Sequence, residues 1–304
     1  STVNTDWQDL FYKTGIVTDN NISVSGGTET GSYNFGMGYY LNQGVIPTQQ
    51  YKRYSVTGAV DQQIGKYFKA GFSTKEIFGQ SDGNQVGLYN TLSMSPIASP
   101  YNPDGSLKRS IRMPLDNQYI YTKGVVDSLQ DTDQWVNQTN GFASYNAIYG
   151  EVKAPWVEGL KFRINLGLDY TQANNGAYTG QGVGDGANPN TVSTGSKDAR
   201  NNFHWTVENL LSYDHTFSQK HTINAVALYS AEQNKYTRTN IAATDIPANA
   251  FLYYNLGRGA TVTVDPNNQD YQLWGLESFM GRVMYSYNNR YIVSATVRSD
   301  GSSR

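Results

Sequence analysis

The feature that most constrains this chain is an alternation of apolar and polar residues with a period of two. In residues 161–170, Phe162, Ile164, Leu166 and Leu168 alternate with polar residues or glycine. Such a pattern is typical of a β-strand with one apolar face, because successive side chains of a strand point to opposite sides. The alternation predicts about ten strands, most clearly at 32–41, 53–64, 161–170, 203–214, 279–287 and 291–298, less regularly at 20–25, 68–78, 143–152 and 221–231, with 7–13 as a further candidate.

The connections between the predicted strands alternate in length. In an up-and-down antiparallel sheet, this order places every tight turn at one end and every long loop at the other. Outer-membrane barrels have this arrangement, with short periplasmic turns and long extracellular loops. Short turns are predicted at 28–31, 65–67, 155–159, 218–220 and 288–289, and long loops at 42–52, 81–140, 174–202 and 237–277.

A soluble antiparallel sheet packed on a core would show the same alternation, but three features favour a barrel. Strands of about ten residues suit a tilted span of a bilayer, whereas ordinary strands average about five or six residues. Aromatic residues gather near strand ends, as in the girdles at membrane interfaces. The opposite face carries charged residues, asparagine and glycine, which suit a water-filled lumen better than a packed core. The predicted fold is therefore an all-β, antiparallel, up-and-down transmembrane barrel.

Composition excludes several other classes of protein. The 25 acidic and 23 basic residues leave a net charge of −2, so no strong field attracts nucleic acid. The longest apolar runs, such as residues 225–229, are far shorter than the roughly 18 to 20 residues of a membrane helix. The absence of cysteine removes disulfides, thiolate metal sites and cysteine nucleophiles.

The two ends of the chain predict that it is a piece of a longer protein. The first seven residues have no basic start, no apolar segment and no small-residue cleavage site, so no export signal is expected there. Residues 291–304 read as a strand that continues further. We therefore expect a single domain over residues 1–304, a partial barrel.

Several longer stretches resemble one family. They are Asn4-Thr5-Asp6-Trp7-Gln8-Asp9, residues 21–29 with Ser32-Tyr33-Asn34-Phe35, Gln43-Gly44-Val45-Ile46 with residues 51–55, and the closing residues 289–304. In this order and spacing they resemble the barrel of the SusC/RagA family of TonB-dependent outer-membrane transporters of Bacteroidota. The matches bracket nearly the whole chain, while the interior loops match only in character.

The resemblance implies a 22-stranded barrel in the outer membrane of a Gram-negative bacterium, filled by a plug and capped by a SusD-like lipoprotein. It implies import of oligosaccharides or oligopeptides driven through the TonB complex. The chain would supply about 10 to 11 strands, with the plug, the TonB contact and the C-terminal barrel half outside it. Its partners would be the SusD-like lipoprotein, the TonB complex, membrane lipid and the imported substrate.

No residue pattern predicts an enzyme or a metal site, and no cofactor is expected. Ser212, Asp214 and His215 lie near a strand end, and neighbouring residues alternate between faces, so they do not converge. His215 and His221 flank a turn and are expected to be solvated. Asp127, Asp131 and Asp133 share a loop that lacks the glycine and glutamate of an EF-hand, which favours a solvated acidic loop.

The long loops are the most plausible place for substrate contact. Aromatic rings and side-chain amides suit sugar rings and peptide backbones, although the same aromatics also suit packing between loops or against the lipoprotein. The alternative function is a soluble β-rich module that binds glycans or mediates adhesion. The candidate substrate-binding residues are Tyr89, Tyr101, Tyr119, Tyr121, Trp135, Tyr178, Tyr253, Tyr254 and Trp274.

Overall fold

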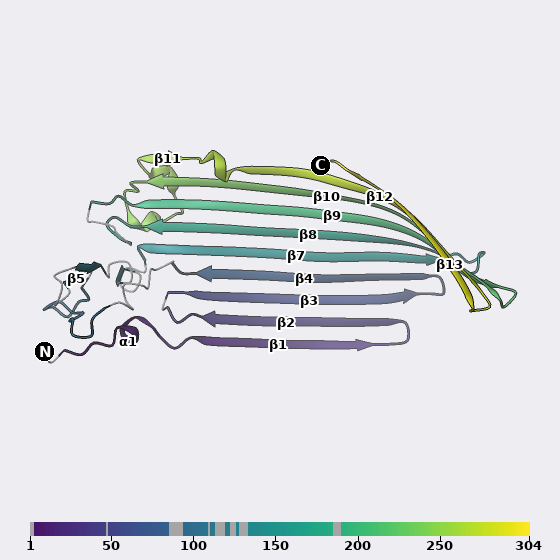
Figure 1. The fold of residues 1–304 in the computed structure, drawn as a ribbon, viewed down its shortest axis with the longest axis horizontal. Helices are drawn as coiled ribbons and strands as arrows, with labels where there is room; N and C mark the ends of the chain where they lie inside the picture. The colour runs from purple at the N-terminus through teal and green to yellow at the C-terminus, as the bar shows by residue number, and fades with distance from the viewer. Residues whose placement is uncertain are drawn as a thin grey trace.

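A computed structural model shows one curved antiparallel sheet, with most loops gathered at one end of it and short turns at the other (Figure 1). The structure describes residues 3–46, 48–84, 94–108, 110–112, 119–121, 126–127, 133–184 and 190–304. Among these residues, no helix is both long and apolar enough to cross a membrane.

Ten long strands form the sheet in chain order, β1-β2-β3-β4-β7-β8-β9-β10-β12-β13, so each strand pairs with its neighbours in sequence. The short strand β11 (Thr261–Thr263) pairs with the end of β10, and β5 (Ser110–Arg112) pairs with β6 (Tyr119–Tyr121). The long strands are β1 (Ile16–Gly27), β2 (Gly31–Gln43), β3 (Gln50–Ile64), β4 (Phe68–Asp82), β7 (Trp135–Lys153), β8 (Leu160–Thr179), β9 (Thr194–Phe217), β10 (His221–Thr244), β12 (Asp270–Tyr287) and β13 (Tyr291–Ser302).

The fold confirms the predicted antiparallel, up-and-down β architecture. The five short turns fall where they are predicted, and all lie at the same end of the sheet. In the β9–β10 turn, Ser218 and Gln219 have φ of 49° and 59°, and in the β12–β13 turn, Asn288 and Asn289 have φ of 51° and 53°. These left-handed conformations reverse the chain tightly between paired strands. β1 and β13 are the two edges of the sheet.

The strand proposed near the N-terminus is wrong, because Trp7–Phe11 forms a short helix, α1. Asp6 caps it, and its carboxylate accepts hydrogen bonds from the backbone N–H groups of Gln8 and Asp9, both at 3.0 Å. These bonds satisfy donors that a helix start leaves unpaired. α1 lies at the loop end of the sheet, where Trp7 and Phe11 pack against Met94, Ala98, Ile111 and Val126.

Several strands are longer than the alternation predicts. β9 and β10 each have 24 residues, and β8 has 20. The extra residues lie at the loop end, so the predicted loops 174–202 and 237–277 shrink to residues 180–193 and 245–269. Three short 3₁₀ turns, η1 (Asn249–Phe251), η2 (Leu256–Arg258) and η3 (Pro266–Asn268), lie in the second of these.

The described part of the sheet is a single layer. Apart from Val183, the buried apolar residues of the described chain fall in two small clusters, both at the loop end: the cluster around Trp7 and Phe11 of α1, and Tyr178, Ala243, Ile246, Tyr253 and Leu256. Along the strands themselves, large apolar side chains remain exposed, as at Ile22 (72%) and Met37 (63%). Hydrogen bonding between strands therefore organises this part of the fold. Loop 245–260 covers the apolar side at the strand ends, and the rest of that side is not covered by a second layer of the described chain.

Candidate functional site

The sheet has an apolar face and a polar face, which the pairing register makes continuous from strand to strand. On the apolar face, Met37 of β2 lies beside Ile22 of β1 and Val56 of β3. Further along, Phe72 of β4 lies beside Ile148 of β7. A wide exposed apolar surface of this kind is stable only against a partner or lipid.

Aromatic residues form a row across the apolar face toward the loop end. Tyr39, Tyr54, Phe78 and Phe142 are successive register partners on β2, β3, β4 and β7. Ring centroids of Tyr39 and Tyr54 lie 5.1 Å apart, and those of Tyr54 and Phe78 lie 6.4 Å apart. We call this the outer aromatic row, and it continues through Tyr170 and Phe203, which pair between β8 and β9.

A second set of aromatics lies on the same face near the turns, and includes Phe68, Phe162, Tyr213 and Tyr287. Phe68 and Phe78 lie ten residues apart on β4. At about 3.3 Å per residue and a strand tilt of about 40°, they are separated by roughly 25 Å across the membrane. This is the height of the apolar band of an outer-membrane barrel, so the two sets fit the two interfaces of a bilayer.

The polar face carries a hydrogen-bonded network near the turn end. The Tyr149 hydroxyl donates to Asp61, whose carboxylate also lies 3.5 Å from the Lys69 ammonium group. The Arg163 guanidinium lies 3.9 Å from the centre of the Tyr149 ring, and its Nε donates to Asn165 at 2.7 Å. The network joins strands β3, β4, β7 and β8, and would be costly against lipid but is stable against water.

A shallow depression of about 440 Å³ lies beside this network. Small side chains form its floor, because Ala59, Ser73, Ala147 and Gly167 are register partners on four neighbouring strands. Larger polar residues stand around it, including Lys75, Tyr145 and Asp169. The polar face therefore offers both space and hydrogen-bonding groups to a hydrophilic solute or to another part of the protein.

Nearer the loops, the polar face holds His204 between two carboxylates. Its Nδ1 lies 3.5 Å from Asp169 Oδ2, and its Nε2 lies 3.4 Å from Glu232 Oε2. The Trp274 ring lies 6.2 Å from the imidazole, and the Arg304 guanidinium lies 4.8 Å from the Trp274 ring centre. This group combines acceptors, a cation and aromatic surface at the depth of the outer aromatic row.

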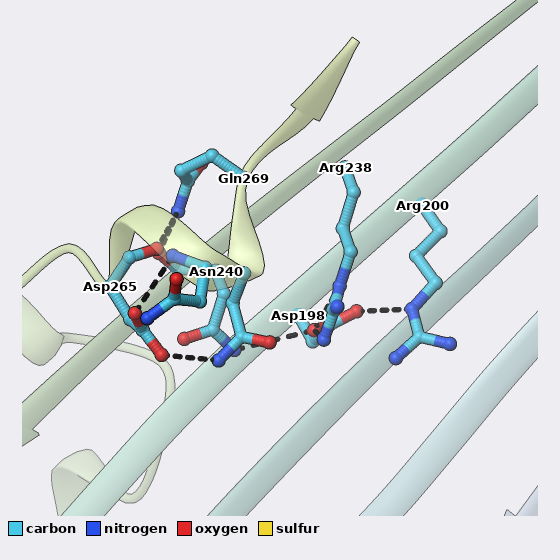
Figure 2. Close-up of polar contacts among 8 residues, drawn as sticks. Asp198, Arg200, Arg238, Asn240, Asp265 and Gln269 are labelled. Carbon is cyan, nitrogen blue, oxygen red and sulfur yellow. Dashed lines mark hydrogen bonds and ion pairs between the residues drawn. The ribbon is translucent and has the colours of Figure 1, made fainter. Parts of the chain in front are cut away.

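Above that depth, Asp198 connects the ends of β9 and β10 (Figure 2). Its carboxylate accepts from Arg238 Nε at 2.9 Å and Nη2 at 2.5 Å, and from Arg200 Nε at 2.6 Å. The side chain of Asp198 is only 10% exposed, whereas that of Arg200 is 51% exposed. In the adjoining segment before β12, Gln269 Nε2 donates to the carbonyl oxygen of Asn240 at 2.7 Å. These contacts hold that segment against the strand ends.

Three of the predicted substrate-binding aromatics lie together on the apolar side of the strand ends. Tyr178 continues the apolar face of β8, is 1% exposed, and donates to Asn249 Oδ1 at 2.6 Å. Tyr253 folds back onto the same side and donates to Gln138 Oε1 at 3.2 Å, while Tyr254 is 65% exposed. Burial, followed by the hydrogen bond to Tyr254, raises the pKa of Tyr253, so its hydroxyl remains a donor. Loop 245–260 therefore covers the apolar side of the sheet at the loop end of the strands.

The other predicted residues are distributed differently. Trp135 and Trp274 share the polar face with Tyr145 and His204. Tyr101 is 48% exposed and forms an isolated bridge with Leu107. Tyr119 and Tyr121 belong to β6, and Tyr89 lies outside the described residues. Contact of any of these residues with substrate stays a prediction.

The structure separates the residues that resemble a catalytic triad. Ser212 and Asp214 lie on the polar face, whereas His215 lies on the apolar face, where its ring is 4.5 Å from that of Phe217. His221 begins β10 and lies 2.7 Å from the Tyr285 hydroxyl, so the predicted solvated loop histidines are instead strand residues beside aromatics. His215 and His221 differ from the prediction because β9 extends to Phe217 and β10 begins at His221, so both histidines lie within strands.

The acidic loop agrees with the prediction at Asp133, which is exposed, and differs from it at Asp127. Asp127 is fully buried, and its Oδ2 accepts from the backbone N–H of Gly184 at 3.0 Å, so it is not solvated. Asp131 lies outside the described residues. Within the part of the chain that the structure describes, no group of three histidine or acidic residues is arranged to hold a metal ion.

The fold and its two faces define the class of this chain: it is part of the wall of a transmembrane antiparallel β-barrel. Its apolar face has the height and the aromatic borders of a membrane-facing surface, and its polar face lines the interior. Comparison with known proteins agrees with this class, although no family model matches the chain.

The chain is similar over nearly its whole length to TonB-dependent receptors. TonB-dependent receptor P3 of Formosa agariphila is 28% identical over 314 residues, covering 99% of this chain and 30% of the relative. TonB-dependent receptor SusC of Bacteroides thetaiotaomicron is 22% identical, covering 100% of this chain and 31% of SusC. The structure of the RagAB peptide transporter matches with a TM-score of 0.76 and 18% identity, covering 99% of this chain and 33% of that chain.

These similarities confirm the resemblance to SusC/RagA-type transporters and the location in the outer membrane of a Gram-negative bacterium. The chain spans about 30% of the length of the curated relatives it matches. The relatives are receptors and transporters rather than enzymes.

Proposed function

We propose that this chain is a wall segment of a TonB-dependent importer that takes up oligosaccharides or oligopeptides together with a SusD-like surface lipoprotein. In this proposal the loops and the lipoprotein capture the substrate outside the cell. The TonB complex then displaces the plug, and the substrate passes along the polar face of the barrel. In this proposal the plug and the TonB contact lie outside residues 1–304.

The observation that carries this proposal is the division of one sheet into two faces. Side chains such as Met37 and Phe72 are exposed on one side, between two sets of aromatics. On the other side, charged and amide groups form continuous networks across several strands. A wall between lipid and a water-filled passage requires this division.

The alternative, a soluble module for glycan binding or adhesion, would have to cover the apolar face with protein. An extraction experiment on the full-length protein separates the two functions. We expect it to remain in the membrane pellet through carbonate and high-salt washes and to dissolve in detergent. Release into either wash would contradict the membrane assignment.

Import is tested by deleting the gene of the full-length protein and supplying single glycans or peptides as nutrient. Growth on one class should fail in the deletion strain and in a strain lacking TonB, and should return with the intact gene. The lipoprotein should copurify with the tagged transporter. Normal growth of the deletion strain on every glycan and peptide supplied would argue against nutrient import.

The placement of the aromatics makes the residue-level proposal more specific. Trp274 lies on the polar face with acceptors around it, whereas Tyr254 projects from the outside of the wall. We expect Trp274→Ala to slow uptake about tenfold, because losing one aromatic contact costs about 1 to 2 kcal/mol. Tyr254→Ala is the matched control and should leave uptake unchanged. Equal uptake by the two variants would remove Trp274 from the substrate path.

A further inference from the structure

The outside of the wall changes character immediately beyond the outer aromatic row. On the same face of the strands, the next residues toward the loops are mainly amides instead of apolar groups. We call them the outer amide belt; its members are Gln50, Gln80, Gln138, Asn140, Gln172 and Asn201. On the same face, Lys52 pairs with Gln80 of the belt, whereas Lys235 pairs with Phe203 of the outer aromatic row.

Hydrogen bonds order the belt and connect it to the aromatic row. Asp82 Oδ2 accepts from Gln50 Nε2 at 2.9 Å, and Asp82 Oδ1 accepts from Gln138 Nε2 at 2.7 Å. Tyr170 of the aromatic row donates to Asn201 Oδ1 at 3.2 Å. Because an amide nitrogen carries two hydrogens, Gln50 and Gln138 each keep one donor after binding Asp82. The Asp82 carboxylate therefore fixes the orientation of the amides that donate to it, and these amides surround its negative charge.

The depth of the outer amide belt in the membrane indicates which part of the lipid layer it contacts. Gln80 and Asp82 lie two and four residues beyond Phe78 on β4. With the rise and tilt used above, they stand about 5 to 10 Å outside the aromatic row. The polar headgroup layer is roughly 5 to 8 Å thick on each side of the hydrocarbon. The belt therefore begins at the depth of the outer-leaflet headgroups, at Gln80, and reaches their outer boundary at Asp82.

We propose that the outer amide belt binds the sugar and phosphate headgroups of lipopolysaccharide, the glycolipid of the outer leaflet. Amides pair with sugar hydroxyls as donor and acceptor at once, and Lys52, which pairs with Gln80 of the belt, supplies charge for phosphate. Loop 245–260 forms one border of this surface, because Tyr253 donates to Gln138 of the belt. This inference rests on the membrane location and is independent of what the protein imports.

The test uses the full-length protein and a triple variant, Lys52→Ala, Asn140→Ala and Gln172→Ala, which leaves the partners of Asp82 intact. Its matched control is Arg53→Ala, Thr139→Ala and Thr171→Ala, because each residue is one position along the strand and faces the lumen. Resistance of the folded barrel to SDS without heating establishes that both variants fold. A single variant, Gln172→Ala, is included as a milder change.

Binding is measured by titrating each protein in detergent with rough lipopolysaccharide, which carries lipid A and core sugars, and separately with phosphatidylglycerol. We expect the triple variant to bind lipopolysaccharide about tenfold more weakly, since it loses several hydrogen bonds of roughly 1 kcal/mol each. The control should change less than about twofold on the same scale. Free core oligosaccharide should compete with lipopolysaccharide for the unaltered protein.

Three results would overturn the inference. The first is unchanged lipopolysaccharide binding by the folded triple variant. The second is an equal loss toward phosphatidylglycerol, which would reduce recognition to the phosphate charge that both lipids share and leave no role for the sugars. The third is loss of the copurifying lipoprotein with lipopolysaccharide binding intact, which would make the belt a protein interface. None of these results depends on import, which the growth experiments test separately.

Discussion

At the scale of single residues, Asp198 joins the ends of two neighbouring strands, β9 and β10, at the loop end of the sheet. One carboxylate, nearly buried, accepts from two arginines on neighbouring strands. Arg238 is 24% exposed and is held at two nitrogens, whereas Arg200 is half exposed and is held at one. The more buried pair therefore contributes most, because exposed ion pairs are screened by water and salt.

We expect Asp198→Asn to destabilise the ends of β9 and β10 by about 2 kcal/mol, since a neutral amide replaces the acceptor of charge-assisted hydrogen bonds. Hydrogen exchange of amides in residues 194–200 and 238–244 should then accelerate by about 30-fold. Asp265→Asn is the control, because that carboxylate binds within its own turn, to Asn267 N–H and Asn268 Nδ2. Unchanged exchange in the Asp198 variant would show that the strand ladder alone holds these ends.

Sequence reasoning could select candidate residues more readily than it could assign them to a side of the wall. Tyr178 lies eight residues after Tyr170, so it has the parity of the apolar face if the strand continues to it. The apolar–polar alternation stops before Tyr178, so the pattern predicts a loop at this residue. Tyr253 reaches the same place through a folded-back segment, for which strand periodicity carries no information.

At the scale of elements, the sequence predicts the membrane-spanning part of each strand and misses its extension. Apolar alternation persists only while one face meets lipid and the other meets water. Beyond the outer aromatic row both faces meet polar surroundings, as at Gln138 and Asn137 of β7, and the pattern disappears while the strand continues. α1 cannot be predicted from periodicity, because its five residues are too few to show a helical period.

The turns provide a prediction at this scale. The β9–β10 and β12–β13 turns have the same left-handed backbone conformation but different residues, Ser218-Gln219 and Asn288-Asn289. Asn tolerates the left-handed region, whereas most other residues pay about 1 kcal/mol or more for it. We expect Ser218→Asn with Gln219→Gly to raise the unfolding free energy by about 1 kcal/mol. Asn288→Ser with Asn289→Gln, which gives the second turn the residues of the first, should lower it by a similar amount. Urea unfolding midpoints in vesicles measure both, and midpoints that do not move in opposite directions would contradict the argument.

At the scale of the whole molecule, the two faces of the sheet should respond oppositely to the same change. Phe72 is 43% exposed on the apolar face, near the middle of the band between Phe68 and Phe78. Ser73 is the next residue and faces the lumen beside Ala59 and Ala147. Neighbouring positions on one strand thus allow a charge to be placed in lipid or in water with the surrounding backbone unchanged.

We expect Phe72→Arg to destabilise the full-length protein in phospholipid vesicles by about 2 to 4 kcal/mol, the cost of a cation near the bilayer centre. Ser73→Arg should change stability by less than about 0.5 kcal/mol, because its guanidinium remains hydrated. Urea titration in vesicles measures the difference, and repeating it in thinner bilayers should shrink the cost at Phe72 alone, since the charge then lies nearer an interface. A cost at Phe72 that is independent of bilayer thickness would mean that protein, and not lipid, covers this face.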